Sequence, residues 1–464
     1  MAFLQIFIIR QPTWEEMVMD LDVVLLSRLQ FAMTVGFHFI FPPISIGLAW
    51  LLVIAEFLGC QKGDEDYVRI GKFFGKLFSL TFAVGVATGI VMEFQFGMNW
   101  AEYSKFVGDI FGAPLAAEGV FAFFLESSFL GLYLFGRNRV SKGVHWFSAL
   151  MVAVGATTSA FWIIVANSWQ QTPAGYVVRN GRAELTSFSE AVFNPSTLLR
   201  FFHTVDAALI TGAFFMAGVA AYLLLKNREV PVAKKAMKLA VIFGLIVSLL
   251  ELFPIGHEHA RQVAHTQPEK FAAFEGLYIS QSGAPLVLFA FPQERPPDLK
   301  ATVEIPGLLS WLAFGDVNAR IQGIDEFPAD EIPPLFLTFV SFHNMAALGI
   351  YFILIMAWGA VQLVRNKLWG SKKLLRLFVW SIPLPVIACQ FGWIAAEVGR
   401  QPWIVYGLLK TRDAYSFTVT GGEVLFSIVL FSLIYLLLGS LYLFLLVREI
   451  KHGPQTIRAE GVSA

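Results

Sequence analysis

The sequence predicts an all-α integral membrane protein with about nine transmembrane helices, and three observations lead to this fold class. Of the 464 residues, 56% are hydrophobic and only 15% are charged, whereas soluble domains carry about 25% charged residues. Apolar runs of the roughly 20 residues that a bilayer requires recur along the whole chain. The 34 basic and 34 acidic residues cancel, and the chain has only two cysteines. The high hydrophobic content excludes a disordered chain, the two cysteines exclude a disulfide scaffold, and the zero net charge excludes a protein that binds nucleic acid electrostatically.

Nine apolar runs define the expected helices in chain order. They lie near 24–57, 72–100, 114–136, 143–168, 197–225, 236–256, 333–363, 374–397 and 420–447. The first run contains Pro42 and Pro43, so we expect a kink there, because proline removes a backbone donor and clashes with the preceding turn. The N-terminus lacks the ordered regions of a signal peptide, so we expect none to be removed.

The spacing of the runs divides the chain into three sections. Residues 1–256 hold helices one to six, residues 257–332 form a long, polar, proline-rich connection, and residues 333–464 hold helices seven to nine and a tail. Lys and Arg gather in alternate connections and in the tail, and cytoplasmic loops are the ones enriched in these residues. The pattern predicts an N-terminus outside, a cytoplasmic C-terminus and an extracytoplasmic 257–332 connection.

Ionisable side chains inside the predicted spans are the candidate functional residues, since placing them in lipid is costly. With the topology above, they converge from six helices on the outer half of the membrane. The candidates are His38, Glu93, Glu118, Glu126, His203, His343 with Met345, and Glu397. A single His or Met on an apolar helix is also typical of ordinary packing, but scattered packing residues have no reason to share one layer.

These residue types favour haem over a bare metal ion. Structural zinc needs close Cys and His pairs, which the sequence does not contain. A His with a distant Met is a ligand pair of six-coordinate, electron-transferring haem, and a lone His or Glu leaves an iron position open for dioxygen. Glu118 and Glu126 are eight residues apart and so share a helix face, where they suit proton delivery or hydrogen bonds to neighbouring helices.

Several stretches resemble subunit I of the cytochrome bd-type quinol oxidases. They are SRLQFAMT and FHFIF within 27–41, GVATGIVMEFQFGMNW at 85–100, VGDIFGAPLAAEG and FFLES within 107–127, SAFWIIVANSWQQTP at 159–173, FFHTV at 201–205 and GWIAAEVGRQPW at 392–403. They are spread over nearly the whole chain, and the last is the most specific. The resemblance implies a terminal respiratory oxidase that oxidises quinol at the outer face and reduces dioxygen to water with protons from the inner side.

The resemblance also implies ligands for three haems. His203 and Met345 match the axial pair of the low-spin haem, b558. His38 and Glu397 match single ligands of two high-spin haems, b595 and haem d, or a further b haem in place of haem d. Family members differ in which of these two sites holds haem d, so that assignment stays open.

Further polar residues match positions around the haems. Trp393 and Arg400 match neighbours of the haems, and an arginine can bind a propionate through two hydrogen bonds. Glu118 and Glu126 match the acidic pair on the proton route. The other candidates for a proton path are Glu93, Ser159 and Asn167.

The 257–332 connection carries the expected quinol site. Lys270 and Glu275, in EKFAAFEG, match the quinol pair; Glu275 would accept a hydroxyl proton and Lys270 would hold an oxygen, although spacing alone fits solvated surface charge. GHEHARQVAHTQPEK and the short connection resemble the cyanide-insensitive subgroup. At His343 the family often has Arg, which makes His343 a rival of Met345 as a ligand, and the motif position favours Met345.

The resemblance implies a multi-pass protein of the bacterial cytoplasmic membrane that pairs with a second membrane subunit, subunit II, and possibly with a small single-span subunit. Two other classes fit the intramembrane charges. One is a membrane b-type cytochrome that only relays electrons from quinol. The other is a proton-coupled transporter, a class that often shows internal repeats, which this sequence does not.

Overall fold

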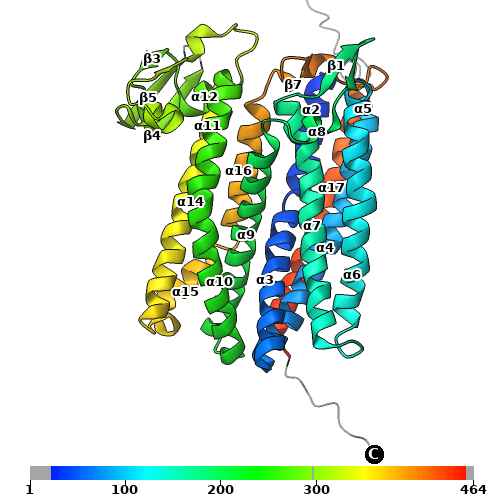
Figure 1. The fold of residues 1–464 in the computed structure, drawn as a ribbon, viewed down its shortest axis with the longest axis vertical. Coiled ribbons are helices and arrows are strands. Elements are labelled where there is room, and N and C mark those ends of the chain that lie inside the picture. The colour runs from blue at the N-terminus through cyan, green and yellow to red at the C-terminus, as the bar shows by residue number, and fades with distance from the viewer. Residues whose placement is uncertain (1–21, 295–296, 456–464) are drawn as a thin grey trace, which may run out of the picture.

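A computed structural model describes residues 22–294 and 297–455 as a bundle of long helices with small hairpins at one end (Figure 1). In this part of the chain, nine helical spans are long and apolar enough to cross a membrane, which confirms the predicted class. Residues 1–21, on which the expectation about a signal peptide rests, lie outside the described residues.

Four of the nine spans consist of more than one helical segment. In chain order the spans are α2 (Val23–His38) with α3 (Phe41–Lys62), α4 (Glu65–Met98), α5 (Ala101–Ala117) with η1 (Glu118–Phe123) and α6 (Phe124–Phe135), α7 (Lys142–Gln171), α9 (Thr197–Leu225), α10 (Val230–Leu250) with η2 (Glu251–Gly256) and α11 (His257–Thr266), α14 (Leu335–Val364), α15 (Lys372–Trp380) with α16 (Leu384–Val398), and α17 (Gly421–His452). Both η1 and η2 are π-helical turns, which are frequent at functional sites.

The predicted kink in the first span is confirmed. Helix α2 ends at His38, and Pro42 and Pro43 fall in the first turn of α3, where proline is tolerated because the first backbone N–H groups of a helix have no partner within it. His38 therefore lies at the break between the two helices.

Two spans extend furthest beyond their predicted limits. The third begins at Ala101 rather than near 114, and the sixth continues to Thr266 rather than ending at 256. The added sequence of the sixth span is polar, but it stays helical because Val263 and Ala264 bury one face. The connection after this span therefore begins at Gln267, ten residues later than predicted.

Helix α9 forms the centre of the bundle. In its most apolar window 78% of the residues are buried, against 11% in the third span and in α17. Helices α3 and α9 touch backbone to backbone: a Cβ on Gly47 would lie 2.1 Å from the carbonyl oxygen of Ala208, and one on Gly212 would meet the backbone of Gly47. Small residues permit this approach in membrane bundles, where close packing drives helix association.

The connection between the sixth and seventh spans is a folded cap. Its elements are α12 (Pro268–Glu275), β3 (Gln281–Ser282), β4 (Leu286–Glu294), β5 (Pro297–Ile305), α13 (Leu308–Phe314), β6 (Arg320–Ile321) and η3 (Ile324–Glu326). Strands β4 and β5 form an antiparallel hairpin, so the helical bundle carries short strands that the all-α prediction omitted. Figure 1 places the cap beyond α11 and α14.

Shorter elements complete the same end of the bundle. They are β1 (Tyr176–Arg179), β2 (Arg182–Leu185), α8 (Phe188–Val192), β7 (Trp403–Val405), β8 (Leu409–Lys410) and η5 (Thr411–Asp413), whereas η4 (Leu368–Gly370) precedes α15. Helix α7 ends, α9 begins and α16 ends near these elements (Figure 1). Residues far apart in the sequence are thereby brought to one end of the bundle.

Candidate functional site

A dense polar cluster surrounds Glu397 near the end of α16. The carboxylate accepts hydrogen bonds from Arg400 Nη2 at 2.5 Å, Asn167 Nδ2 at 3.1 Å and Gln171 Nε2 at 3.4 Å. Arg400 lies just beyond the helix end, and Asn167 and Gln171 are one turn apart on α7. Such donors offset the cost of removing a carboxylate from water.

A second arginine completes this cluster. Arg200, on α9, donates to Asn167 Oδ1, and Arg400 Nη1 donates to Gln170 Oε1 at 3.3 Å. Gln170 Nε2 in turn donates to the buried Tyr103 hydroxyl at 2.5 Å. Two arginines thus lie around one carboxylate, an excess of positive charge that suits anionic groups such as haem propionates. The sequence analysis identified Arg400 but missed Arg200.

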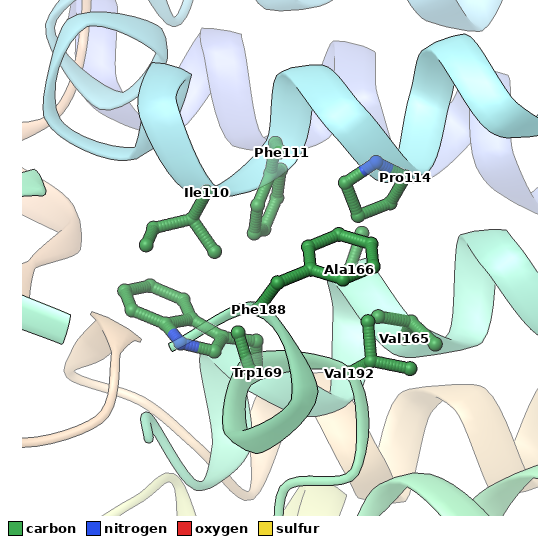
Figure 2. A pocket seen from close by; sticks show the side chains of 9 residues that line it. Ile110, Phe111, Pro114, Val165, Ala166, Trp169, Phe188 and Val192 are labelled. Carbon is green, nitrogen blue, oxygen red and sulfur yellow. The ribbon is translucent and has the colours of Figure 1, made fainter. Parts of the chain in front are cut away.

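Apolar packing between α5 and α7 holds this end of α7 in place, as Figure 2 shows. Phe111 and Trp169 meet edge to face with ring centroids 6.1 Å apart. The remaining space, lined also by Ile110, Pro114 and Val165, is a cavity of about 10 Å³, the lower limit for a single water, and its lining is apolar. It is a packing contact that positions the polar residues of α7.

Lys270 joins the cap to the Glu397 cluster. The side chain is buried, and Nζ donates to Gln171 Oε1 at 3.0 Å and to the carbonyl oxygen of Ala396 at 3.0 Å. Burial, together with the nearby Arg200, lowers the pKa of Lys270 well below its ordinary value. The structure therefore places this predicted quinol residue one residue from Glu397, inside the protein rather than on a solvated surface.

Glu275 lies at the other end of α12. It is 4% exposed, and its Oε2 has no hydrogen-bond partner among the described residues. Burial raises the pKa of Glu275 to about 8. The other glutamate of this helix, Glu269 at its opposite end, is also buried but accepts a hydrogen bond from Tyr406 at 3.1 Å. Glu275 is thus the carboxyl of this helix that is open to a new partner.

His203 lies on α9 against the π-helical turn of the sixth span. Its Nδ1 is 2.7 Å from Glu251 Oε1, and its ring packs against that of His259 with centroids 4.9 Å apart. The sequence analysis missed both Glu251 and His259. The signal for Glu251 was present, since it is an acidic residue inside an apolar span.

Met345 and His343 lie on α14 but have different surroundings. Met345 Sδ lies 2.8 Å from the position that a Cβ on Gly392 would take, so it packs against bare backbone of α16 one residue before Trp393. His343 has a carbonyl oxygen beside each ring nitrogen: Nδ1 lies 3.1 Å from that of Phe339 and Nε2 lies 2.9 Å from that of Val287, on β4. In this structure His343 holds the cap hairpin against α14.

His38 is fixed by a neutral partner. Its Nδ1 lies 3.0 Å from Thr88 Oγ1, on α4. The Thr88 hydroxyl is itself 2.9 Å from the Val84 carbonyl oxygen, to which it donates. Thr88 therefore accepts from Nδ1–H, and this leaves the other ring nitrogen, Nε2, free for a ligand.

The two acidic residues of the third span, which were predicted to share a helix face, both contact α7. Glu118 accepts a hydrogen bond from Ser159 Oγ at 2.7 Å. Glu126 is buried and packs against Gly155, one turn away from Ser159 on the same helix. Glu93, on α4, is exposed but close enough to Glu118 to interact with it electrostatically.

The structure thus brings Glu397, Arg400, Asn167 and Lys270 into one cluster and places the other candidates in separate surroundings. Nine spans that enclose single His, Met and Glu side chains, with arginines beside them, are typical of a membrane protein that holds a cofactor or an ion pathway. Such groups are costly in lipid and mark a cofactor or an ion pathway.

The chain belongs to the family of subunit I of the cytochrome bd terminal oxidases, which are terminal quinol oxidases: the family model matches residues 26–454. Cytochrome bd ubiquinol oxidase subunit 1 of Bacillus subtilis (strain 168) is 44% identical over 441 residues, 93% of this chain and 94% of the relative. Cytochrome bd-II ubiquinol oxidase subunit 1 of Escherichia coli (strain K12) is 35% identical over 507 residues, 95% of this chain and 98% of the relative. A chain in the structure of bd oxidase from Geobacillus thermodenitrificans has a TM-score of 0.89 at 33% identity, over 93% of this chain and 99% of that one.

Proposed function

We propose that this oxidase subunit takes electrons from quinol at the cap and delivers them to dioxygen inside the bundle, with protons released outside and taken up from inside. The contact between Lys270 Nζ and the Ala396 carbonyl oxygen carries this proposal. It ties α12, the helix of the expected quinol pair, directly to the segment that presents Glu397. Such a contact can hold substrate and cofactor at a fixed separation.

The residues present fit the haem groups that the family implies. His203 and Met345 are proposed for the low-spin haem, b558, and His38 and Glu397 for the two high-spin haems, b595 and haem d or a further b haem. In His38 Nδ1 is hydrogen-bonded to Thr88, and in His203 Nδ1 lies beside the Glu251 carboxylate, so Nε2 is the nitrogen proposed for iron in both. Both nitrogens of His343 lie at carbonyl groups, which favours Met345 as the ligand. When bound, haem supplies one-electron transfer and an iron that binds dioxygen.

The protein's own groups handle the protons. Glu275 accepts a proton from the quinol hydroxyl at the cap, and Lys270, already bonded to the α16 backbone, orients the ring. The contact between the third span and α7 contains Glu118, Ser159 and Glu126. These residues carry protons from the cytoplasmic side to the site of dioxygen reduction inside the bundle. Release outside and uptake inside generate a proton-motive force without a pump.

The proposed setting is the bacterial cytoplasmic membrane with the N-terminus outside and the C-terminus inside. The low burial of the third span and of α17 leaves apolar helix faces for lipid and for the expected second subunit. The distribution of Lys and Arg supports this orientation.

Spectroscopy of the purified oxidase tests the proposal. We expect a low-spin b signal in the reduced-minus-oxidised spectrum, loss of that signal in His203→Ala, and carbon monoxide binding by the reduced protein. A protein that does not bind carbon monoxide would instead be an electron relay, and a protein without haem would favour a transporter.

A further inference from the structure

The surroundings of His203 contain a charged partner that the family resemblance does not assign. His203 Nδ1 and Glu251 Oε1 are 2.7 Å apart, and the two side chains are 22% and 16% exposed. The pair is an ion contact, in which the carboxylate lies close to Nδ1 without meeting the angle of a hydrogen bond. Both ends of the π-helical turn lie near the ring, since a Cβ on Gly256 would be 3.9 Å from Nδ1. The turn thus presents Glu251 to one edge of the imidazole.

We propose that Glu251 is a positioning residue for His203: the negative charge beside Nδ1 keeps the proton on that nitrogen, leaves Nε2 for iron, and strengthens His203 as an electron donor. This inference rests on the proposed role of His203 as a haem ligand. Ligating histidines commonly donate their other N–H to a carboxylate, which fixes ring orientation and raises ligand basicity.

His38 provides an internal comparison. Its Nδ1 meets the neutral hydroxyl of Thr88 at 3.0 Å, whereas that of His203 meets a carboxylate. An anionic partner gives the ring more electron density than a hydroxyl does, and a more basic ligand stabilises ferric iron. The structure therefore assigns the stronger histidine donor to the low-spin site, where a lower potential sends electrons onward to the His38 and Glu397 sites.

Other ionisable groups surround this pair. The ring of His259 packs against His203, and Arg200 and Asp206 lie on the same helix one turn before and after it. Asp206 is buried and interacts with Glu251 rather than with His203. It is therefore a matched control, because Asp206→Asn alters a polar neighbour of Glu251 and leaves both His203 and Glu251 in place.

Three variants of the purified oxidase test the proposal: Glu251→Gln, Glu251→Asp and Asp206→Asn. The readouts are the midpoint potential of the low-spin haem and the electron paramagnetic resonance g-values of its ferric form. Glutamine keeps an acceptor but removes the charge, so we expect a retained low-spin haem whose reduction is favoured at least tenfold, about 59 mV for one electron, with shifted g-values. Aspartate is one methylene shorter and should move both readouts in the same direction.

Asp206→Asn should shift the potential less and leave the g-values unchanged. Wild-type potential and g-values in both Glu251 variants would overturn the proposal, as would a shift no larger than that of Asp206→Asn. If Glu251→Gln does not assemble, the Glu251→Asp readouts decide alone. His203→Ala tests the ligand role of His203 separately from the role of Glu251. If the low-spin haem survives this change, His203 is not its ligand. If the low-spin haem is lost while both Glu251 variants behave as wild type, only the proposed role of Glu251 is rejected.

Discussion

At the scale of single residues, the two candidates on α12 differ in whether their hydrogen bonds are already made. Lys270 is bonded to Gln171 and to the backbone of α16. Glu275 is equally buried, but its Oε2 has no partner among the described residues. A buried carboxyl without partners is costly, so Glu275 is the group that gains most from binding a quinol hydroxyl.

Quinol oxidation should depend on Glu275 and on pH. Its pKa of about 8 leaves roughly a tenth of it ionised at pH 7 and about half at pH 8. A base must be ionised to accept a proton, so turnover at low quinol should rise roughly twenty-fold between pH 6.5 and 8.5. Glu275→Gln should lower turnover about 100-fold or more, remove this rise and leave the haem spectra intact.

Glu269→Gln is the matched control on the same helix. Glu269 is buried but already accepts a hydrogen bond from Tyr406, so its neutralisation should leave the pH profile of turnover in place. Equal losses in the two variants would mean that α12 only needs its buried carboxyls for packing.

A second pair of variants separates Met345 from His343. Met345→Leu removes the proposed thioether ligand, so the low-spin spectrum should convert to a high-spin one. His343→Ala removes the contact with the Val287 carbonyl oxygen, so the β4–β5 hairpin should loosen and the KM for quinol should rise while the low-spin spectrum stays. The reverse pattern of spectra would make His343 the ligand.

Sequence motifs could predict which residues are candidate ligands or proton carriers, but they could not predict the residues with which these candidates are in contact. The positions of His203 and Glu397 follow from short motifs, and the facing of Glu118 and Glu126 toward one neighbour follows from helical periodicity. The partners Glu251, Arg200 and Thr88 come from other helices, and only tertiary packing brings them into contact. Lys270 shows the limit best, because its spacing fitted a surface charge and its burial depends on how the cap docks on α16.

At the scale of elements, the contact between α3 and α9 sets the centre of the bundle. Gly47→Ala places a methyl group at 2.1 Å from the Ala208 carbonyl oxygen, so the helices must move apart. Overpacking of this kind costs about 1–3 kcal/mol or more, and we expect a melting temperature several degrees lower in detergent. Gly131→Ala, on α6, is the control, since a Cβ there meets nothing within 4 Å; equal melting temperatures would contradict the tight contact.

Hydropathy could predict the spans but not their internal irregularities. It located all nine apolar stretches because lipid requires them. The π-helical turns at Glu118–Phe123 and Glu251–Gly256 were not predicted, because a π-turn keeps the same composition as the helix around it. These turns begin at Glu118 and Glu251, so the irregular backbone coincides with two of the acidic residues inside the spans.

At the scale of the whole molecule, the net charge is zero, but the basic and acidic residues occupy different parts of the fold. Basic residues gather in alternate connections, while several acidic ones lie inside the spans. The cap end holds α12 and the ends of α7 and α16 (Figure 1). The proposed sites of electron entry and proton release therefore lie toward one face, and the proposed proton uptake starts from the other.

The native cysteines can test this orientation directly. Cys60 is exposed near the end of α3 that precedes a predicted inner connection, whereas Cys389 is less exposed, on α16. A membrane-impermeant maleimide should therefore label Cys60 in inverted membrane vesicles and not in intact spheroplasts, and Cys60→Ser should abolish the labelling. In that background Asp298→Cys, on the cap strand β5, should be labelled in spheroplasts. Labelling of Cys60 from outside would reverse the topology and with it the direction proposed for proton release.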